Sequence, residues 1–122
     1  MCRKNEILSR SFGFSLNVIE FCELLEEKRK FVLSKQLLRS GTSIGACIRE
    51  AQQAESKADF CHKLKIAAKE TEETEYWLLL CKMSPYYPAP EDLLLEIISL
   101  KKLLNKIIST TKRNIHAQKY SQ

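Results

Sequence analysis

Hydrophobic residues recur along most of this chain at alternating spacings of four and three, the repeat of helices packed lengthwise against one another. The clearest run comprises Phe60, Leu64, Ala67, Thr71, Thr74, Leu78 and Cys81. A second run, built from smaller residues, comprises Leu37, Gly41, Ile44, Ile48 and Ala51. Small residues on a packed face allow the backbone of another helix to approach closely. The pattern therefore predicts two long helices in the middle of the chain, with a short break at residues 54–56.

Extending the same pattern to both ends predicts an all-α protein. We expect four helices, over residues 11–27, 34–53, 57–83 and 91–115. Residues 1–10 are polar and unpatterned and are expected to form a loose arm, and residues 116–122 a basic tail. Because short connections force successive helices to alternate in direction, we predict a single domain over residues 1–122, an up-down-up-down four-helix bundle.

Helix boundary signals support these ranges. Ser34 is a suitable N-cap for the second helix, and Ser56 followed by Asp59 resembles a capping box for the third. Three prolines within residues 85–90 predict a non-helical connection before the fourth helix. The first helix is apolar around much of its girth, because Phe12, Leu16 and Ile19 widen its core face. We expect a helix of that kind to contact neighbours on more than one side.

Composition narrows the class of protein. No apolar run approaches the ~18 residues that a membrane-spanning helix needs, so we expect a cytoplasmic protein. The five cysteines are odd in number and widely spread, which favours reduced thiols in the core over a disulfide framework. No Cys-x-x-Cys pair supports a structural zinc site.

Positive charge is concentrated at the C-terminal end. The net charge is +5, yet the last 22 residues contain six basic side chains and no acidic one. The candidate nucleic-acid-binding residues are Lys101, Lys102, Lys106, Lys112, Arg113 and Lys119. Two interpretations stand: a solvated end that complements the helix dipole, or a surface that displaces counterions from RNA or DNA phosphates. Tyr120 is the only aromatic residue nearby, so binding would be directed to the backbone with little sequence preference.

Several segments together resemble a known family. The stretch from Leu33 to Ala46 reads LSKQLLRSGTSIGA, and residues 107–112 read IISTTK. Between them lie the pairs Glu50–Ala51, Asp59–Phe60, Lys69–Glu70 and Glu73–Thr74, followed by Tyr76–Trp77–Leu78. These segments resemble the bacterial four-helix-bundle proteins encoded by intervening sequences of large-subunit ribosomal RNA genes. Two cysteines depart from the family pattern, since Cys47 replaces a usual asparagine and Cys61 a usual aliphatic residue.

The resemblance implies a four-helix bundle that assembles as a homo-oligomer, typically a pentameric ring, with no settled biochemical activity. It also implies a distant relation to the accessory proteins of diversity-generating retroelements, which are basic rings that bind nucleic acid beside a reverse transcriptase.

An oligomer interface is the favoured interpretation of the third helix's outer face. With Phe60 and Leu64 at heptad positions a and d, Trp77 falls at f, opposite the packed face, and would be exposed in a monomer. Tyr76, Trp77 and Leu80 are therefore candidate interface residues. The alternative is a wide core in which Trp77 covers a gap.

Three charged residues are candidates for structural ion pairs. Arg39 and Glu50 are close to three helical turns apart, so they lie on one side of the second helix. Arg39 is also placed to pair with Glu73 on the next helix or across a subunit boundary. We expect these residues to act in structural specificity rather than in catalysis.

No enzyme site emerges from the sequence. Asp59-x-x-His62 resembles one element of a di-iron bundle, but Arg113 occupies the matching position before His116. We therefore expect no metal, no cofactor and no enzymatic activity. The leading interpretation is an oligomeric protein associated with RNA, DNA or a ribonucleoprotein. The alternative is a protein-interaction scaffold or accessory subunit, for example to a reverse transcriptase, without direct nucleic-acid binding.

Overall fold

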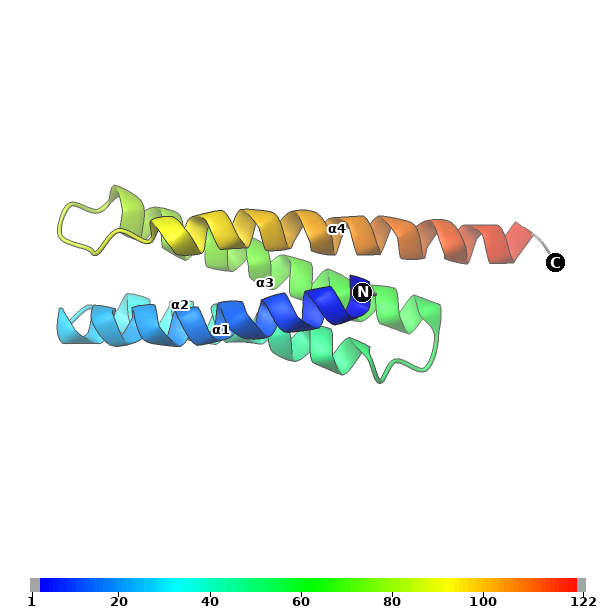
Figure 1. The fold of residues 1–122 in the computed structure, drawn as a ribbon, viewed down its shortest axis with the longest axis horizontal. Coiled ribbons are helices and arrows are strands. Elements are labelled where there is room, and N and C mark those ends of the chain that lie inside the picture. Colours follow the sequence, from blue (N-terminus) through cyan, green and yellow to red (C-terminus); the bar gives the residue numbers. More distant parts are fainter. Residues whose placement is uncertain (1–2, 121–122) are drawn as a thin grey trace.

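The computed structural model describes residues 3–120, which form four α-helices and no strand (Figure 1). The helices are α1 (Arg3–Glu27), α2 (Phe31–Ala51), α3 (Lys57–Met83) and α4 (Glu91–Tyr120). Successive helices run side by side in opposite directions and form an elongated four-helix bundle. α4 also contacts α1, which closes the bundle.

The core lies along the bundle axis, where each helix contributes a row of buried side chains. The largest fully buried side chains include Phe14, Leu25, Leu37, Ile44, Ile48, Leu64, Leu78, Ile97, Leu100 and Leu104. In α3 the predicted row is buried from Leu64 to Cys81, but it begins at Cys61 because Phe60 is only partly buried. Thr71 and Thr74 are tolerated in this row because their hydroxyls donate to carbonyls of α3 itself, 2.6 Å to Ala68 and 2.7 Å to Glu70.

The expected loose arm over residues 1–10 was wrong for residues 3–10, which are the start of α1. Ile7 and Ser11 are each 1% exposed, and they extend the four–three spacing of Phe14 and Val18 towards the N-terminus. Burial of Ile7 therefore stabilises two further helical turns that the polar composition of this stretch conceals. Met1 and Cys2 lie outside the described residues.

The expected start of α2 at Ser34 was also wrong, because α2 begins at Phe31. Arg29 has φ of 64° in the left-handed region, so the chain reverses within a very short turn and the helix starts earlier. Ser34 lies buried inside the helix instead of capping it. Its hydroxyl donates to the Cys22 carbonyl at 3.2 Å, and the Cys22 thiol donates to the Ser34 carbonyl at 3.4 Å. α2 ends at Ala51, two residues before the expected end at residue 53.

α3 has the boundaries expected from the sequence. The Ser56 hydroxyl accepts a hydrogen bond from the Asp59 amide at 3.0 Å, and the Asp59 carboxylate accepts one from the Glu55 amide at 3.2 Å. These two bonds satisfy donors at the exposed helix start.

The expected basic tail over residues 116–122 was wrong for residues 116–120, where α4 continues to Tyr120. Ile115 packs on the core, and the His116 and Tyr120 rings lie 4.5 Å apart one turn from each other. Such contacts between residues four apart support a helix. Residues 121–122 lie outside the described part of the chain.

α1 packs much more closely on α2 than on α4. A Cβ atom at Gly41 would lie 2.9 Å from both Val18 methyl groups, so only glycine permits this spacing of α1 and α2. α1 and α4 are joined instead by longer polar side chains. The Asn17 amide donates to the Glu96 carboxylate at 2.8 Å, and Arg10 donates to Ser99.

Candidate nucleic-acid interface

α4 carries an exposed cationic surface from Lys102 to its C-terminal end. In Figure 1 the last turns of α4 extend beyond the other three helices. The exposed members of the predicted set are Lys102, Lys106, Lys112, Arg113 and Lys119. None of the five forms an ion pair within residues 3–120. We call these five residues the basic face of α4. Its cations are free to exchange counterions for the phosphates of a ligand.

Lys101, the sixth predicted residue, lies apart from this face. Its ammonium nitrogen is 2.9 Å from a Glu75 carboxylate oxygen and 3.2 Å from one of Glu72. The hydrogen bond to Glu75 is the main cause that raises the pKa of Lys101. Lys101 therefore joins α4 to α3 and contributes little positive charge to the surface.

A small hollow lies between the start of α3 and the end of α4. It measures about 240 Å³ and is lined by Ala58, Cys61, His62, Lys65, Lys112 and Ile115. We call it the basic hollow. His62 and Lys65 were not predicted as binding residues, because they lie far from Lys112 in the sequence. The available signal was a group of lysines in the first half of α3, which an antiparallel bundle brings beside the end of α4.

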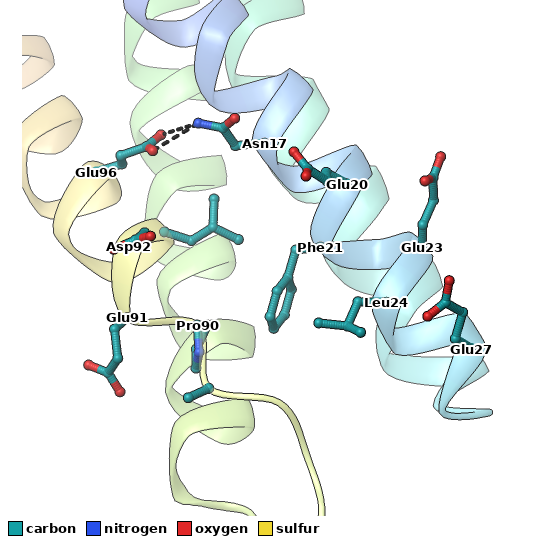
Figure 2. A pocket seen from close by; sticks show the side chains of 12 residues that line it. Asn17, Glu20, Phe21, Glu23, Leu24, Glu27, Pro90, Glu91, Asp92 and Glu96 are labelled. Atoms are coloured by element: carbon teal, nitrogen blue, oxygen red, sulfur yellow. Dashed lines mark hydrogen bonds between the residues drawn. The ribbon is translucent and has the colours of Figure 1, made fainter.

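A larger hollow has the opposite charge. It lies between α1 and α4 near the connection at residues 84–90 and measures about 610 Å³ (Figure 2). Its carboxylates are Glu20, Glu23, Glu27, Glu91, Asp92 and Glu96, and no lysine or arginine lines it. We call it the acidic hollow. Phe21 and Leu24 point into the space between the two helices in Figure 2. Six carboxylates repel phosphates, so this hollow is no candidate for a nucleic-acid interface.

Of the three candidate ion-pair residues, two are brought together. The Glu73 carboxylate accepts hydrogen bonds from Arg39 of α2 and from the Trp77 indole nitrogen, the latter at 3.0 Å. Arg39 also lies 3.5 Å from Glu70. Glu50 is exposed and forms no ion pair with the described residues. Since Arg39 is half exposed, this cluster orients α2 and α3 more than it stabilises them.

The candidate interface residues are less uniform than the heptad position suggested. Trp77 is half-buried and packs against the core of its own chain, held by the bond to Glu73. Tyr76 is exposed and meets the Trp77 ring edge-on, with ring centroids 5.2 Å apart. Leu80 is also exposed. The outer face of α3 therefore presents Tyr76 and Leu80 beside a fixed tryptophan.

A second exposed apolar surface lies on α1. Phe12, Leu16 and Ile19 are 62%, 52% and 41% exposed, and they border a groove of about 840 Å³ whose α2 side includes Gly45 and Ala46. We call these three residues the α1 row. The sequence predicted that these three residues widen the core face of the first helix, but the fold leaves them exposed.

Three cysteine thiols have raised pKa values because they are buried or half-buried. Burial is the main cause that raises the pKa of the Cys22 and Cys81 thiols to about 11, so both stay protonated and unreactive at neutral pH. Cys47 is half-buried, and burial raises its pKa as well.

Within residues 3–120 no three histidine, cysteine or acidic side chains gather as a metal site. No helix in this range is long and apolar enough to cross a membrane.

A family model described as 23S rRNA-intervening sequence protein matches residues 3–106. The crystal structure of a protein of unknown function from the S23 ribosomal protein family of Bacteroides thetaiotaomicron is similar, with 44% sequence identity and a TM-score of 0.83. The match covers 88% of this chain and 99% of that one. No match was found among curated proteins. Lys112, Arg113 and Lys119 lie beyond the segment that the family model matches.

Proposed function

This chain belongs to the family of 23S rRNA-intervening sequence proteins, and we propose that it is a non-enzymatic, cytoplasmic, ring-forming protein that contacts RNA or DNA through the basic face of α4. The observation that carries the proposal is the state of these cations: they are exposed on one continuous helix and form no ion pair with the carboxylates of the described residues. Lys101, by contrast, shows what a cation does in this bundle when acids are within reach.

The expected binding is electrostatic. Each phosphate contact contributes about −0.9 to the slope of log K against log salt on duplex DNA, and about −0.7 on single strands. Five cations per subunit therefore predict steep salt dependence. Tyr120 already packs against His116, and the basic face presents no other aromatic ring for stacking on bases. Affinity should consequently vary little with base sequence.

The test is fluorescence anisotropy with a labelled 20-nucleotide RNA and a duplex DNA of equal length, between 50 and 200 mM salt. The variant replaces Lys112, Arg113 and Lys119 by Gln. Three lost contacts should weaken binding about a hundredfold near 0.1 M salt, equally for unrelated sequences. The matched control replaces Lys28, Arg29 and Lys35, which are exposed at the opposite end of the bundle, and should weaken binding far less. Equal losses in both variants, or no wild-type binding at 50 mM salt, would reject the proposal.

We further propose that the ring forms through two different surfaces. A ring needs a heterologous contact, in which one patch of each subunit meets a different patch of the next. The α1 row is one exposed apolar patch, and Tyr76 and Leu80 on α3, beside the half-buried Trp77, form the other. Exposed apolar side chains in a contiguous row favour association over solvation. The family resemblance favours five copies, which would repeat the basic face around one axis.

Light scattering tests this assembly. Wild-type protein at tens of micromolar should have the mass of several 14.1 kDa subunits. Leu16→Glu should give monomers, and so should Leu80→Glu, because each places a charge on an exposed residue in one half of the contact. Leu95→Glu, on an exposed apolar residue of α4 outside both patches, is the control and should leave the oligomer intact. A wild-type monomer would end the ring proposal.

The alternative function is a protein-interaction scaffold or an accessory subunit, for example to a reverse transcriptase. The groove beside the α1 row favours it, because a groove of this size and apolar character suits a helix of another protein. This alternative would lead if the wild-type protein bound neither RNA nor DNA and remained monomeric.

A further inference from the structure

We propose that the basic hollow is a phosphate-binding site, in which His62, Lys65 and Lys112 together hold one backbone phosphate of the bound nucleic acid. This inference rests on the proposed function and deepens it, because it places a defined contact on α3 as well as on α4. It also assigns a role to His62 and Lys65, which lie outside the cationic set found in the sequence.

The geometry favours an anionic ligand. Lys65 and His62 come from α3 and Lys112 from α4, so positive groups approach the hollow from two helices. Two ammonium groups repel a metal cation, which argues against the imidazole as a metal ligand here. Ala58 belongs to the first turn of α3, where the positive end of the helix dipole adds to the attraction for an anion.

The only carboxylate one turn away on α3 does not cancel this field. Asp59 is three residues before His62, but its carboxylate turns back to accept the Glu55 amide. It is absent from the lining of the hollow. On α4, the lining residues are Lys112 and the apolar Ile115. The two charged side chains that line the hollow, Lys65 and Lys112, are therefore both cationic.

The size of the hollow suits a phosphate group better than a whole small molecule. At about 240 Å³ it is smaller than the roughly 300–1,000 Å³ typical of sites for drug-sized ligands. Ala58, Cys61 and Ile115 form an apolar part without base-reading donors or acceptors. The hollow suits one phosphate of a polymer whose neighbouring phosphates continue along the basic face of α4, where Arg113 and Lys119 follow Lys112.

The experiment measures Lys65→Gln against the labelled 20-nucleotide single-stranded RNA by anisotropy. Loss of one phosphate contact should weaken binding about fivefold at 0.1 M salt and reduce the salt slope by about 0.7. Lys35→Gln removes the same charge from an exposed site on α2 and is the matched control, expected within about twofold of wild type. Circular dichroism melts confirm that both variants fold.

A second readout uses the two histidines of the chain. The imidazole proton resonance of His62, assigned with His116→Gln, should shift on addition of micromolar RNA in the wild type and much less in Lys65→Gln. Inorganic phosphate should produce a comparable shift only at concentrations at least a hundredfold higher.

The outcomes separate the two proposals. If the Lys112, Arg113 and Lys119 variant loses RNA binding while Lys65→Gln matches Lys35→Gln, the hollow is not a phosphate site and the basic face of α4 stands alone. Equal potency of inorganic phosphate and RNA at His62 would make the hollow a site for free phosphate and overturn the inference. Absence of RNA binding by the wild type would overturn both proposals.

Discussion

The two hollows of this bundle are built in the same way and carry opposite charge. Each lies between α4 and a neighbouring helix, near an end of the rod: the acidic hollow beside α1 and the basic hollow beside α3. The acidic hollow has six carboxylates and no lysine or arginine, whereas the basic hollow has two lysines and a histidine and no carboxylate. The net charge of +5 conceals this division.

The difference shows how an antiparallel bundle sorts charge. α4 has acids in its first turn and bases towards its last, as the helix dipole favours at each end. The end of α1 meets the start of α4, and α1 adds carboxylates there. The start of α3 meets the end of α4 and adds lysines. Each neighbour reinforces the charge that α4 already has at that end, so the local field exceeds what any single helix provides.

The largest expected effect comes from breaking the core that holds both hollows. Leu64→Asp places a carboxylate where a side chain is 1% exposed, and it should abolish the cooperative unfolding transition. Loss of a buried leucine costs about 2–5 kcal/mol before the charge is counted, against a total stability of about 5–15 kcal/mol. Leu95→Asp, at a site 69% exposed, should melt within a few degrees of wild type. A native melt for Leu64→Asp would remove α3 from the core.

The next effect concerns the packing of α1, which forms one wall of the acidic hollow. Gly41→Ala would press a methyl group against Val18 and push α1 away from α2. We expect a net destabilisation of about 1–2 kcal/mol, since overpacking outweighs the gain in helix propensity. Gly13→Ala meets nothing within 4 Å and should stabilise by about 0.5–1 kcal/mol. Denaturant melts measure both, and equal signs for the two variants would contradict the close packing.

Reversing the charge of the acidic hollow tests whether charge alone distinguishes the two ends of the bundle. Replacing Glu20, Glu23 and Glu27 by Lys makes this end resemble the basic one. If charge alone determines where nucleic acid binds, the variant should bind labelled RNA about tenfold more tightly than wild type at 0.1 M salt, with a steeper salt slope. The same three positions changed to Gln should give a smaller gain. No gain with Lys would show that the shape of the basic end matters as well.

The smallest effect is repulsion within the acidic hollow itself. Glu20, Glu23 and Glu27 lie three and four residues apart on α1, so Glu23→Gln should stabilise the protein by about 0.2–0.5 kcal/mol at low salt. The gain should fade at 0.5 M salt as screening increases. Glu6→Gln is the control of opposite sign, because Glu6 lies 3.4 Å from Arg10 and its loss should destabilise slightly. Thermal melts at both salt concentrations decide between these outcomes.

Much of the fold was readable because its signals are local. The spacing of Leu64, Ala67 and Leu78 requires only the helical period, and Ser56 with Asp59 marks a helix start within four residues. The predictions were wrong where the structure depends on contacts between residues that are distant in the sequence. Ile7 stabilises its helix only through burial, and Ser34 resembled a cap until its bond to Cys22 on α1 placed it inside α2.

The residues of the candidate site also fall into those predictable from one helix and those that depend on contacts between helices. The basic face of α4 was visible in advance because its residues are consecutive turns of one helix. The ion pairs of Lys101 could not be predicted in the same way, since its partners Glu72 and Glu75 belong to α3. For Trp77 the sequence left two alternatives open, an interface residue or a residue that covers a gap in the core, and its half-buried position depends on a carboxylate shared with Arg39 of α2.

By itself the sequence determined the class of fold, the length of α3 and the cationic end of α4, because hydrophobic period, capping and charge act between residues within a few turns of one another. The tertiary structure alone decided which charges meet: Lys65 beside Lys112, Glu20 opposite Glu96, and Lys101 against two glutamates. The physical reason is the short distance over which these side chains interact. Ion pairs and hollows depend on distances of a few ångströms between helices, and only the packing of the whole bundle sets those distances.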